Sequence, residues 1–186
     1  TKPIYLIDQN NYVARINILN NNDDQIKGMI NLLTINNPSS IYLPEGFKAI
    51  IPENTKLNSY SLDKGLLKLD FSKEFLNVSK DDSENLITSL VYSLTELNNV
   101  DKIMIFIEGV KLLKIPNTDK LIPNELDRSI GINKVYDISS LKDIKETTTY
   151  YIAKYNDLIY YVPVSSFSNN DNEKIQIIIK NLKTSP

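Results

Sequence analysis

The chain of 186 residues is 41% hydrophobic and 24% charged, which is the composition of one or two globular domains with a substantial core. Its 21 basic and 23 acidic side chains give a net charge of −2, so it lacks the basic excess that nucleic-acid binding requires. The absence of cysteine and histidine excludes disulfides, thiolate nucleophiles, Cys/His metal sites and histidine-based acid-base catalysis.

The first predicted elements are a hairpin and a capped helix. Two β-branched apolar runs, residues 4–7 and 12–18, flank a turn rich in Asn and Asp at 8–11. A helix follows a cap among residues 22–24, and its apolar side chains recur at helical spacing, namely Ile26, Met29, Ile30 and Leu33. Gly28 inside this helix predicts a strand packed tightly against it.

A proline-rich stretch and a second hairpin come next. Residues 36–52 hold three prolines, which predicts irregular structure with a short edge strand at 48–51. Residues 56–62 and 66–72 flank a predicted three-residue loop at 63–65. Alternation then places one apolar set on the buried face, consisting of Leu67, Leu69 and Phe71.

The longest predicted helix follows Ser79 and Asp82, which have the spacing of a capping box. Its broad apolar stripe consists of Leu86, Ile87, Leu90, Val91, Leu94 and Leu97. The stripe predicts a helix that ends at residues 98–99. Residues 103–107 are apolar on both faces, which predicts a central strand, and residues 108–109 form the turn after it.

The segment 22–33 recurs near the C-terminus at a constant offset. Its residues Ile26, Ile30 and Leu33 match Ile175, Ile179 and Leu182. The second copy would consist of a hairpin with strands at 147–153 and 158–167 and a helix at 172–182. A repeat at this spacing indicates a duplicated module.

Residues 116–146 separate the two copies. They contain two prolines and no sustained period, so we predict a connector with a helical turn at 138–144. We therefore expect a complete domain at residues 1–115, this connector, and the first part of a truncated second domain at 147–186.

Two carboxylate pairs, Asp23-Asp24 and Asp81-Asp82, are candidates for a divalent-metal site or for acid-base chemistry. Each pair begins a predicted helix, where carboxylates cap free N–H groups and complement the helix dipole. Neither pair has the spacing of a calcium loop. A structural role is therefore the favoured interpretation of both.

The remaining inventory offers little chemistry. The candidate nucleophiles, which have no histidine to activate them, are the hydroxyls of Ser39, Ser40, Ser165, Ser166 and Ser168. None of the 5 glycines has the spacing of a phosphate-binding loop. We therefore predict no enzymatic activity, no cofactor, and no catalytic, cofactor-binding or metal-binding residues.

Five of the 11 tyrosines cluster in the hairpin predicted at residues 147–167, namely Tyr150, Tyr151, Tyr155, Tyr160 and Tyr161. Aromatic clusters mark binding surfaces, but tyrosine also favours strands. Cross-strand packing is the favoured interpretation over a dedicated interface, and the incomplete second domain would leave some rings exposed.

Several short strings follow one another as they do in the GerMN domain. They are LPEGF at 43–47, IPENT at 51–55, LKLDFSKEF at 67–75, LTEL at 94–97, VDKI at 100–103 and EG at 108–109. The run Asp-Phe-Ser-Lys-Glu-Phe at 70–75 is the most specific of them. The chain thus resembles the GerMN family of sporulation and spore-germination lipoproteins, with a full domain at 1 to about 115 and part of another at 147–186.

The resemblance implies a fold and a function. GerMN domains look like ring-building motifs, which implies an α+β fold with a small mixed sheet packed by two helices, duplicated, with an incomplete second copy. It also implies a non-enzymatic extracytoplasmic protein, anchored by a lipid upstream of residue 1, that contacts other proteins of the channel between mother cell and forespore or self-associates. The alternative is a ligand-binding or signalling module of a membrane-anchored lipoprotein that modulates a sensor kinase.

Overall fold

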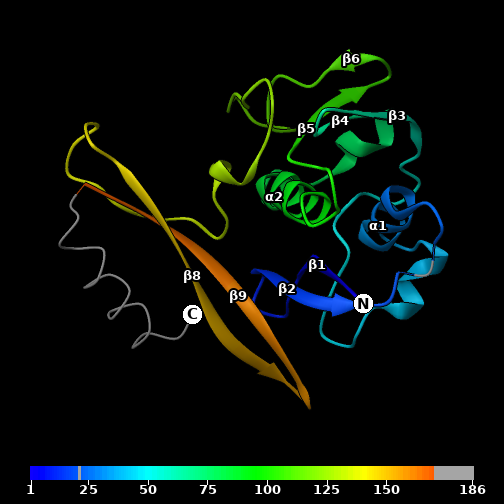
Figure 1. Cartoon of the computed structure of the whole chain (residues 1–186), viewed down its shortest axis with the longest axis horizontal. Coiled ribbons are helices and arrows are strands. Elements are labelled where there is room, and N and C mark those ends of the chain that lie inside the picture. The colour runs from blue at the N-terminus through cyan, green and yellow to red at the C-terminus, as the bar shows by residue number, and fades with distance from the viewer. Residues whose placement is uncertain (21, 170–186) are drawn as a thin grey trace.

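The computed structural model describes residues 1–20 and 22–169, which form two sheets and two α-helices (Figure 1). The strands are β1 Lys2–Ile7, β2 Val13–Ile18, β3 Leu57–Asp63, β4 Leu66–Phe71, β5 Lys102–Ile107, β6 Val110–Lys111, β7 Val135–Asp137, β8 Lys145–Tyr155 and β9 Leu158–Ser168. The helices are α1 Gln25–Leu33 and α2 Ser83–Leu94, with short 3-10 helices η1 Pro38–Tyr42, η2 Lys73–Asn77 and η3 Arg128–Ile130. The predicted α+β class is confirmed.

The opening hairpin and the helix after it are confirmed. Strands β1 and β2 pair antiparallel up to Ile7 and Val13, and the buried Asp8 carboxylate closes the turn by accepting the N–H groups of Asn10 and Tyr12, each at 2.9 Å. Asp24 caps α1 by accepting the Lys27 N–H at 3.0 Å.

The expected strand against Gly28 is wrong. A Cβ atom at this position would overlap the side-chain amide of Asn20, which lies after β2 and donates to the Gln25 carbonyl at 3.3 Å. The glycine therefore makes room for a loop side chain that folds back over the first turn of α1. The sequence pattern could not distinguish a glycine that packs against a strand from a glycine that makes room for a loop side chain.

The hairpin predicted at residues 56–72 is confirmed, but its loop is shorter than predicted. Strand β3 extends to Asp63, which pairs with Leu66, so only Lys64 and Gly65 lie in the turn. Their φ values of 47° and 83° are those of a type I′ turn, whose twist matches that of the flanking strands. A lysine accepts the left-handed conformation here because the turn requires it at both positions.

The four-stranded sheet has the order β3-β4-β5-β6, and α2 is the crossover between the parallel strands β4 and β5. Strand β5 is central, as predicted. The buried face of the sheet consists of Leu67, Leu69, Phe71, Ile103, Ile105 and Ile107. The Ser79 hydroxyl accepts the Asp82 N–H at 3.1 Å and donates to its carboxylate at 2.7 Å. The predicted capping box is nevertheless wrong, because this pair precedes α2: the N-cap residue is Asp82, and its side chain makes no capping hydrogen bond. The α-helix ends at Leu94, earlier than predicted, although Leu97 is still buried in the next turn.

The string at residues 70–75 is a packing motif. The rings of Phe71 and Phe75 are fully buried and stack with their centroids 4.7 Å apart. Ser72 lies between them, and its hydroxyl accepts the Lys56 N–H at 3.0 Å. The most specific part of the family resemblance therefore stabilises the end of β4 and its connection to α2.

The edge strand predicted at 48–51 is wrong. Lys48 exchanges two backbone hydrogen bonds with Ile7, at 2.8 and 3.0 Å, and Ile50 and Ile51 both donate to the Leu33 carbonyl. The segment thus forms isolated bridges that tie β1 to the end of α1. Its partners are distant in sequence, and Pro52 ends the segment before it can form a ladder.

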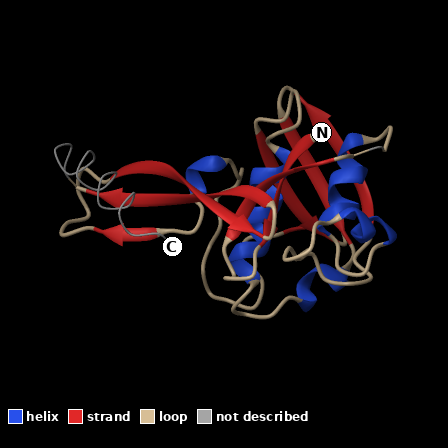
Figure 2. Cartoon of the chain, turned by 90° about the horizontal axis from the view of Figure 1, so that it is seen from below, coloured by secondary structure: helices blue, strands red, loops and turns tan. Residues whose placement is uncertain are grey.

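Strands β8 and β9 form the hairpin that was predicted for the second copy of the repeat. This β8–β9 hairpin extends away from α1 and the four-stranded sheet (Figures 1 and 2). It joins the first hairpin in one sheet of order β1-β2-β9-β7, with β8 paired to β9. Arg15 and Tyr161 are the single paired position between β2 and β9 in the described chain. The helix predicted at 172–182 lies outside the described residues.

The segment between β6 and β8 packs onto the rest of the chain. Leu126 and Ile132 are buried in the main hydrophobic cluster. Asn133 lies where β2 and β9 diverge. Its amide accepts the Val13 N–H at 2.9 Å and donates to the carbonyls of Val13 at 2.8 Å and Pro163 at 2.7 Å. The predicted helical turn at 138–144 is wrong, because these residues form bends after β7.

A charged cluster holds the end of α2 against β1 and η3. The Glu96 carboxylate accepts hydrogen bonds from Arg128 at 2.7 Å and from the Tyr5 hydroxyl at 3.0 Å. The Arg128 guanidinium also lies over the rings of Tyr5 and Tyr92, 5.7 and 5.2 Å from their centroids. Burial alone would raise the pKa of Glu96, but the Arg128 hydrogen bond and charge hold it below its ordinary value of 4.5.

This cluster makes folding stability depend on acid. Because the pKa of Glu96 is lower in the folded state, its stabilising effect is complete above pH 4.5 and is lost as the pH falls below that value. In urea denaturation between about pH 6 and pH 3, we expect a steeper loss of unfolding free energy for the parent protein than for E96Q. Identical pH slopes for the two proteins would contradict this assignment.

Candidate interaction site at the edge of the four-stranded sheet

Two of the four carboxylates singled out in the sequence, Asp24 and Asp82, have local partners. One oxygen of Asp24 caps α1, and the other accepts the Tyr60 hydroxyl at 2.9 Å. Burial alone would raise the pKa of Asp24, but hydrogen bonds from the Lys27 N–H and the Tyr60 hydroxyl hold it below its ordinary value. Asp82 pairs with Ser79. Across residues 1–20 and 22–169, no three acidic side chains converge as a metal site.

The candidate hydroxyls also serve the fold. Ser165 is fully buried, accepts the Ile132 N–H at 3.1 Å and donates to Glu146 at 2.8 Å. Ser166 and Ser168 are buried in β9 as well. The Ser39 N–H donates to Asn37 at the start of η1. The structure does not bring these serines together with Asp23 and Asp24 or with Asp81 and Asp82.

Strand alternation divides the tyrosine cluster into two sets. Tyr151, Tyr155 and Tyr160 lie on the face that packs against the main hydrophobic cluster, where the Tyr160 ring packs edge-on against Phe47 at 4.8 Å and its hydroxyl donates to Asp8 at 3.2 Å. These three tyrosines are packing residues, but the ring contact of Tyr160 is with a residue outside the hairpin and not across its strands. Tyr150 and Tyr161 lie on the opposite face and are 44% and 41% exposed, and Tyr150 lines a hollow together with Tyr92 and Arg128.

Strand β3 presents a free edge, which the sequence did not reveal. It pairs with β4, and no other strand in the described part of the chain pairs with its second edge. Since Asp63 and Leu66 flank a two-residue turn, the odd-numbered residues from 59 to 63 exchange hydrogen bonds with β4. The N–H and C=O groups of Tyr60 and Leu62 therefore point away from the sheet, where a further strand could pair with them.

The side chains of these two residues belong to the buried face but are not covered. Tyr60 lies opposite Leu69 and Leu62 lies opposite Leu67, and both partners are fully buried. Tyr60 and Leu62 themselves are 36% and 39% exposed, because the sheet extends beyond the helices at this edge. An apolar strip is thus left beside unpaired backbone groups.

A groove of about 490 Å³ lies beneath this edge. Its apolar lining includes Ile26, Leu62, Leu97 and Val100, contributed by α1, β3 and the turns after α2. Asp23 and Asp24 form one polar side, and Lys2 contributes a positive charge. The β3 edge and this groove, which we call the β3-edge site, together fit an added strand whose alternate side chains enter the groove.

An edge of this kind usually carries features that prevent pairing. The register shift between Leu57 and Ser59 is a β-bulge, which bends the first part of β3 out of line. The remaining residues, 59–63, are still extended and solvent-exposed. The site is therefore short, which suits a specific partner strand better than open-ended aggregation. In the sequence, the alternation of Tyr60 and Leu62 with serines indicates a strand with one apolar face.

The comparisons with known proteins agree with this fold. Residues 3–113 match the Germane family, whose description is Sporulation and spore germination. Over its full length the chain is 32% identical to the spore germination protein GerM of Bacillus subtilis (strain 168), and it spans about half, 51%, of that relative. Within the described part of the chain, no helix has the length and hydrophobicity needed to cross a membrane.

Two solved structures are similar in fold and sequence. The tandem GerMN domains of the sporulation protein GerM from Bacillus subtilis match with a TM-score of 0.88 and 32% identity, over 100% of this chain and 67% of that one. The first GerMN domain alone matches with a TM-score of 0.65 and 32% identity, over 69% of this chain and 97% of that one. The chain therefore belongs to the Germane family of sporulation and spore germination proteins and has the fold of their GerMN domains.

Proposed function

We propose that this chain is a non-enzymatic extracytoplasmic assembly protein of spore formation and germination, acting through protein–protein contacts in the complex that joins mother cell and forespore. The observation that carries this proposal is the β3-edge site, where unpaired backbone groups lie beside an apolar groove. The assignment to spore formation and germination is supported by relatives that are named as sporulation and spore germination proteins.

The chemistry of the β3-edge site suits binding. A partner strand would gain main-chain hydrogen bonds from Tyr60 and Leu62, and its side chains would cover the apolar lining of the groove. The Asp24 carboxylate is already held by Lys27 and Tyr60, so it is a poor proton acceptor for a reaction. Ser165, one of the serines considered as nucleophiles, is buried and its hydroxyl is bonded to Glu146, which supports a non-enzymatic role.

The domain organisation is part of the proposal. A complete GerMN unit covers residues 1–115, a connector covers 116–146, and residues 147–186 open a second unit. The family match to residues 3–113 supports the first boundary. The exposed face of the β8–β9 hairpin supports the last, since Ile152, Ile159 and Tyr161 form an apolar surface of the kind that a domain core uses. Two linked units would raise the effective concentration of each contact.

The proposed site of action is outside the cytoplasmic membrane, where a lipid anchor would hold the protein; the resemblance to the GerMN lipoproteins supports this location. In that position the β3-edge site would be available to other envelope proteins and to a second copy of the protein. A non-covalent strand contact of this kind leaves both partners chemically unchanged. Self-association through the same edge would give a dimer in which two β3 strands lie side by side.

The test is to block the edge without disturbing the sheet. The Leu62 N–H points away from β4, so L62P removes an outward donor while the ladder with β4 keeps its hydrogen bonds. L62A is the matched control, because it shortens the same side chain and retains the N–H. In a sporulating host that lacks the gene, we expect L62A to restore most heat-resistant spores and L62P to restore few.

Two results would contradict the proposal. Normal spore formation in the deletion strain would remove the assembly role altogether. Equal rescue by L62P and L62A would leave the role intact and exclude the β3 edge as the contact. The purified variants should unfold within about 1 kcal/mol of each other, since surface changes at an edge strand have small effects on stability.

A further inference from the structure

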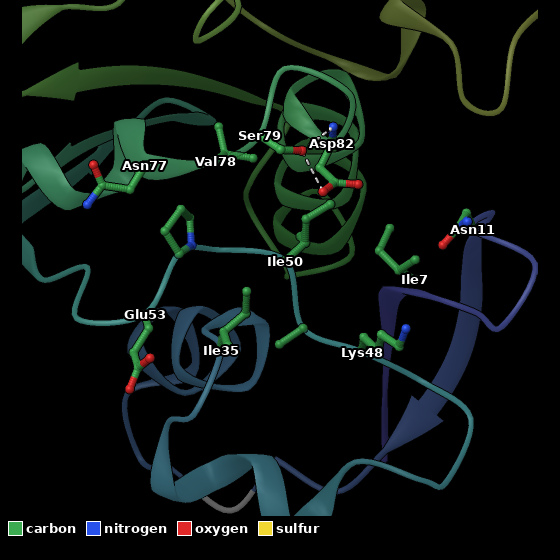
Figure 3. Close-up of a pocket in the computed structure, with 12 residues that line it drawn as sticks. Ile7, Asn11, Ile35, Lys48, Ile50, Glu53, Asn77, Val78, Ser79 and Asp82 are labelled. Atoms are coloured by element: carbon green, nitrogen blue, oxygen red, sulfur yellow. Dashed lines mark hydrogen bonds between the residues drawn. The ribbon is translucent and has the colours of Figure 1, made fainter.

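A second groove, separate from the β3-edge site, lies between the turn of the first hairpin, the segment 48–53 and the loop before α2 (Figure 3). Its volume is about 580 Å³. The apolar lining consists of Ile7, Ile35, Ile50, Pro52 and Val78. Ile7, Ile50 and Val78 are buried, so they form the floor, whereas Ile35 is partly open to solvent. We call this the Ile50 groove.

Polar side chains with spare hydrogen-bonding capacity surround this floor. Asn11 and Asn77 lie on different sides of the groove, and neither side-chain amide has a hydrogen-bond partner among residues 1–20 and 22–169. Ser79 and Asp82 differ, because they are bonded to each other (Figure 3). An amide side chain donates and accepts together, which is the combination that a peptide backbone requires.

Three charged side chains line the groove, and two of them lie apart with opposite sign. Asp82 is bonded to Ser79, whereas Lys48 and Glu53 stand at the two ends of the segment 48–53 (Figure 3). Neither Lys48 nor Glu53 has an opposite charge within ion-pair distance in the described part of the chain. A segment of six residues spans at most about 20 Å when fully extended, so a bound chain of five or six residues is long enough to reach from one charge to the other.

We infer that the Ile50 groove binds an extended segment of another protein, with apolar side chains at its centre and one acidic and one basic side chain at its ends. The acidic end pairs with Lys48 and the basic end with Glu53. The amides of Asn11 and Asn77 bond to the backbone between them. A purely apolar ligand would leave both charges unused, and a ligand of one charge would use only one of them.

The binding test uses three blocked peptides and NMR titration of the whole protein. Ac-EVLVK-NH2 carries both charges, whereas Ac-EVLVE-NH2 and Ac-KVLVK-NH2 carry one kind. We expect the mixed peptide to bind about fivefold more tightly than either other peptide, since one exposed ion pair contributes up to about that factor. The side-chain amide signals of Asn11 and Asn77 should shift during the titration.

Charge reversal then changes the preferred peptide in a defined way. K48E makes both ends of the groove acidic and should favour Ac-KVLVK-NH2, whereas E53K should favour Ac-EVLVE-NH2. K154E reverses an exposed charge in β8 and should leave the preference of the parent protein unchanged. A49F inserts a ring into the lining and should abolish binding, with a dispersed amide spectrum to show that the protein is folded.

Failure of this inference is distinct from failure of the assembly role. Absence of any shift at Asn11 and Asn77 at millimolar peptide would overturn it. So would a preference that stays the same in K48E and E53K. Shifts confined to Tyr60 and Leu62 would assign the peptides to the β3-edge site instead.

Discussion

Replacement of Phe75 by alanine is expected to lower the free energy of unfolding by about 3–5 kcal/mol, the usual cost of a deleted core phenylalanine. The ring is fully buried and stacks on Phe71 at 4.7 Å with an interplanar angle of 18°. Its loss would leave a cavity at the end of β4, and the stacking contribution would be lost with it. Urea denaturation followed by circular dichroism measures the effect.

The adjacent residue provides the control. Leu76 lies in the same 3-10 helix but is 38% exposed, so L76A should cost less than about 1 kcal/mol. Equal destabilisation by the two substitutions would show that the 3-10 helix itself, and not the aromatic stack, carries the stability. A small effect of F75A would remove the explanation given for the string at residues 70–75.

The second large effect is expected at Asn133. N133A removes three hydrogen bonds that bridge β2 and β9 and leaves backbone groups of Val13 and Pro163 without partners. Asn133 also has a φ of 46°, which asparagine tolerates better than alanine. We expect a loss of about 2–4 kcal/mol, since each unsatisfied, partly buried group costs about 1–3 kcal/mol and water replaces some of the bonds.

Hydrogen exchange locates this effect. In N133A the amides of β8 and β9 should exchange faster, whereas those of β4 and β5 should keep their protection, because they belong to the other sheet. N124A is the control, since its exposed side chain bonds only to Lys111 and its loss should change stability by less than about 0.5 kcal/mol. Uniform acceleration across both sheets would show that the two hairpins and the four-stranded sheet unfold as one unit.

Predictions from local pattern were the most successful. The cap at Asp24, the Ser79 and Asp82 pair and the three hairpins β1–β2, β3–β4 and β8–β9 follow from interactions within a few residues along the chain. The central position of β5 follows from its two apolar faces. In each case the residues that specify the element also bond its backbone groups or form its buried face. A short stretch of sequence is therefore enough to predict it.

Predictions that depended on a distant partner failed or could not be made. The segment 48–51 was assigned to an edge, but its partners are Ile7 and Leu33. The neighbour of Gly28 proved to be a loop asparagine. Neither candidate site could be predicted as a site. The edge of β3 is free because no strand of residues 1–20 and 22–169 other than β4 pairs with it, and the Ile50 groove is formed by segments that only folding brings together.

The sequence by itself determined the α+β class, the faces of the strands and the cap of α1, together with the lack of histidine and cysteine chemistry. It did so because side-chain period, turn residues and composition act locally. Only the tertiary structure decided how the β8–β9 hairpin joins the β1–β2 hairpin through Asn133. It also decided which backbone edge and which charges have no partner among the described residues. Those outcomes depend on contacts between residues far apart in the chain, whose selection is a property of the whole packed core.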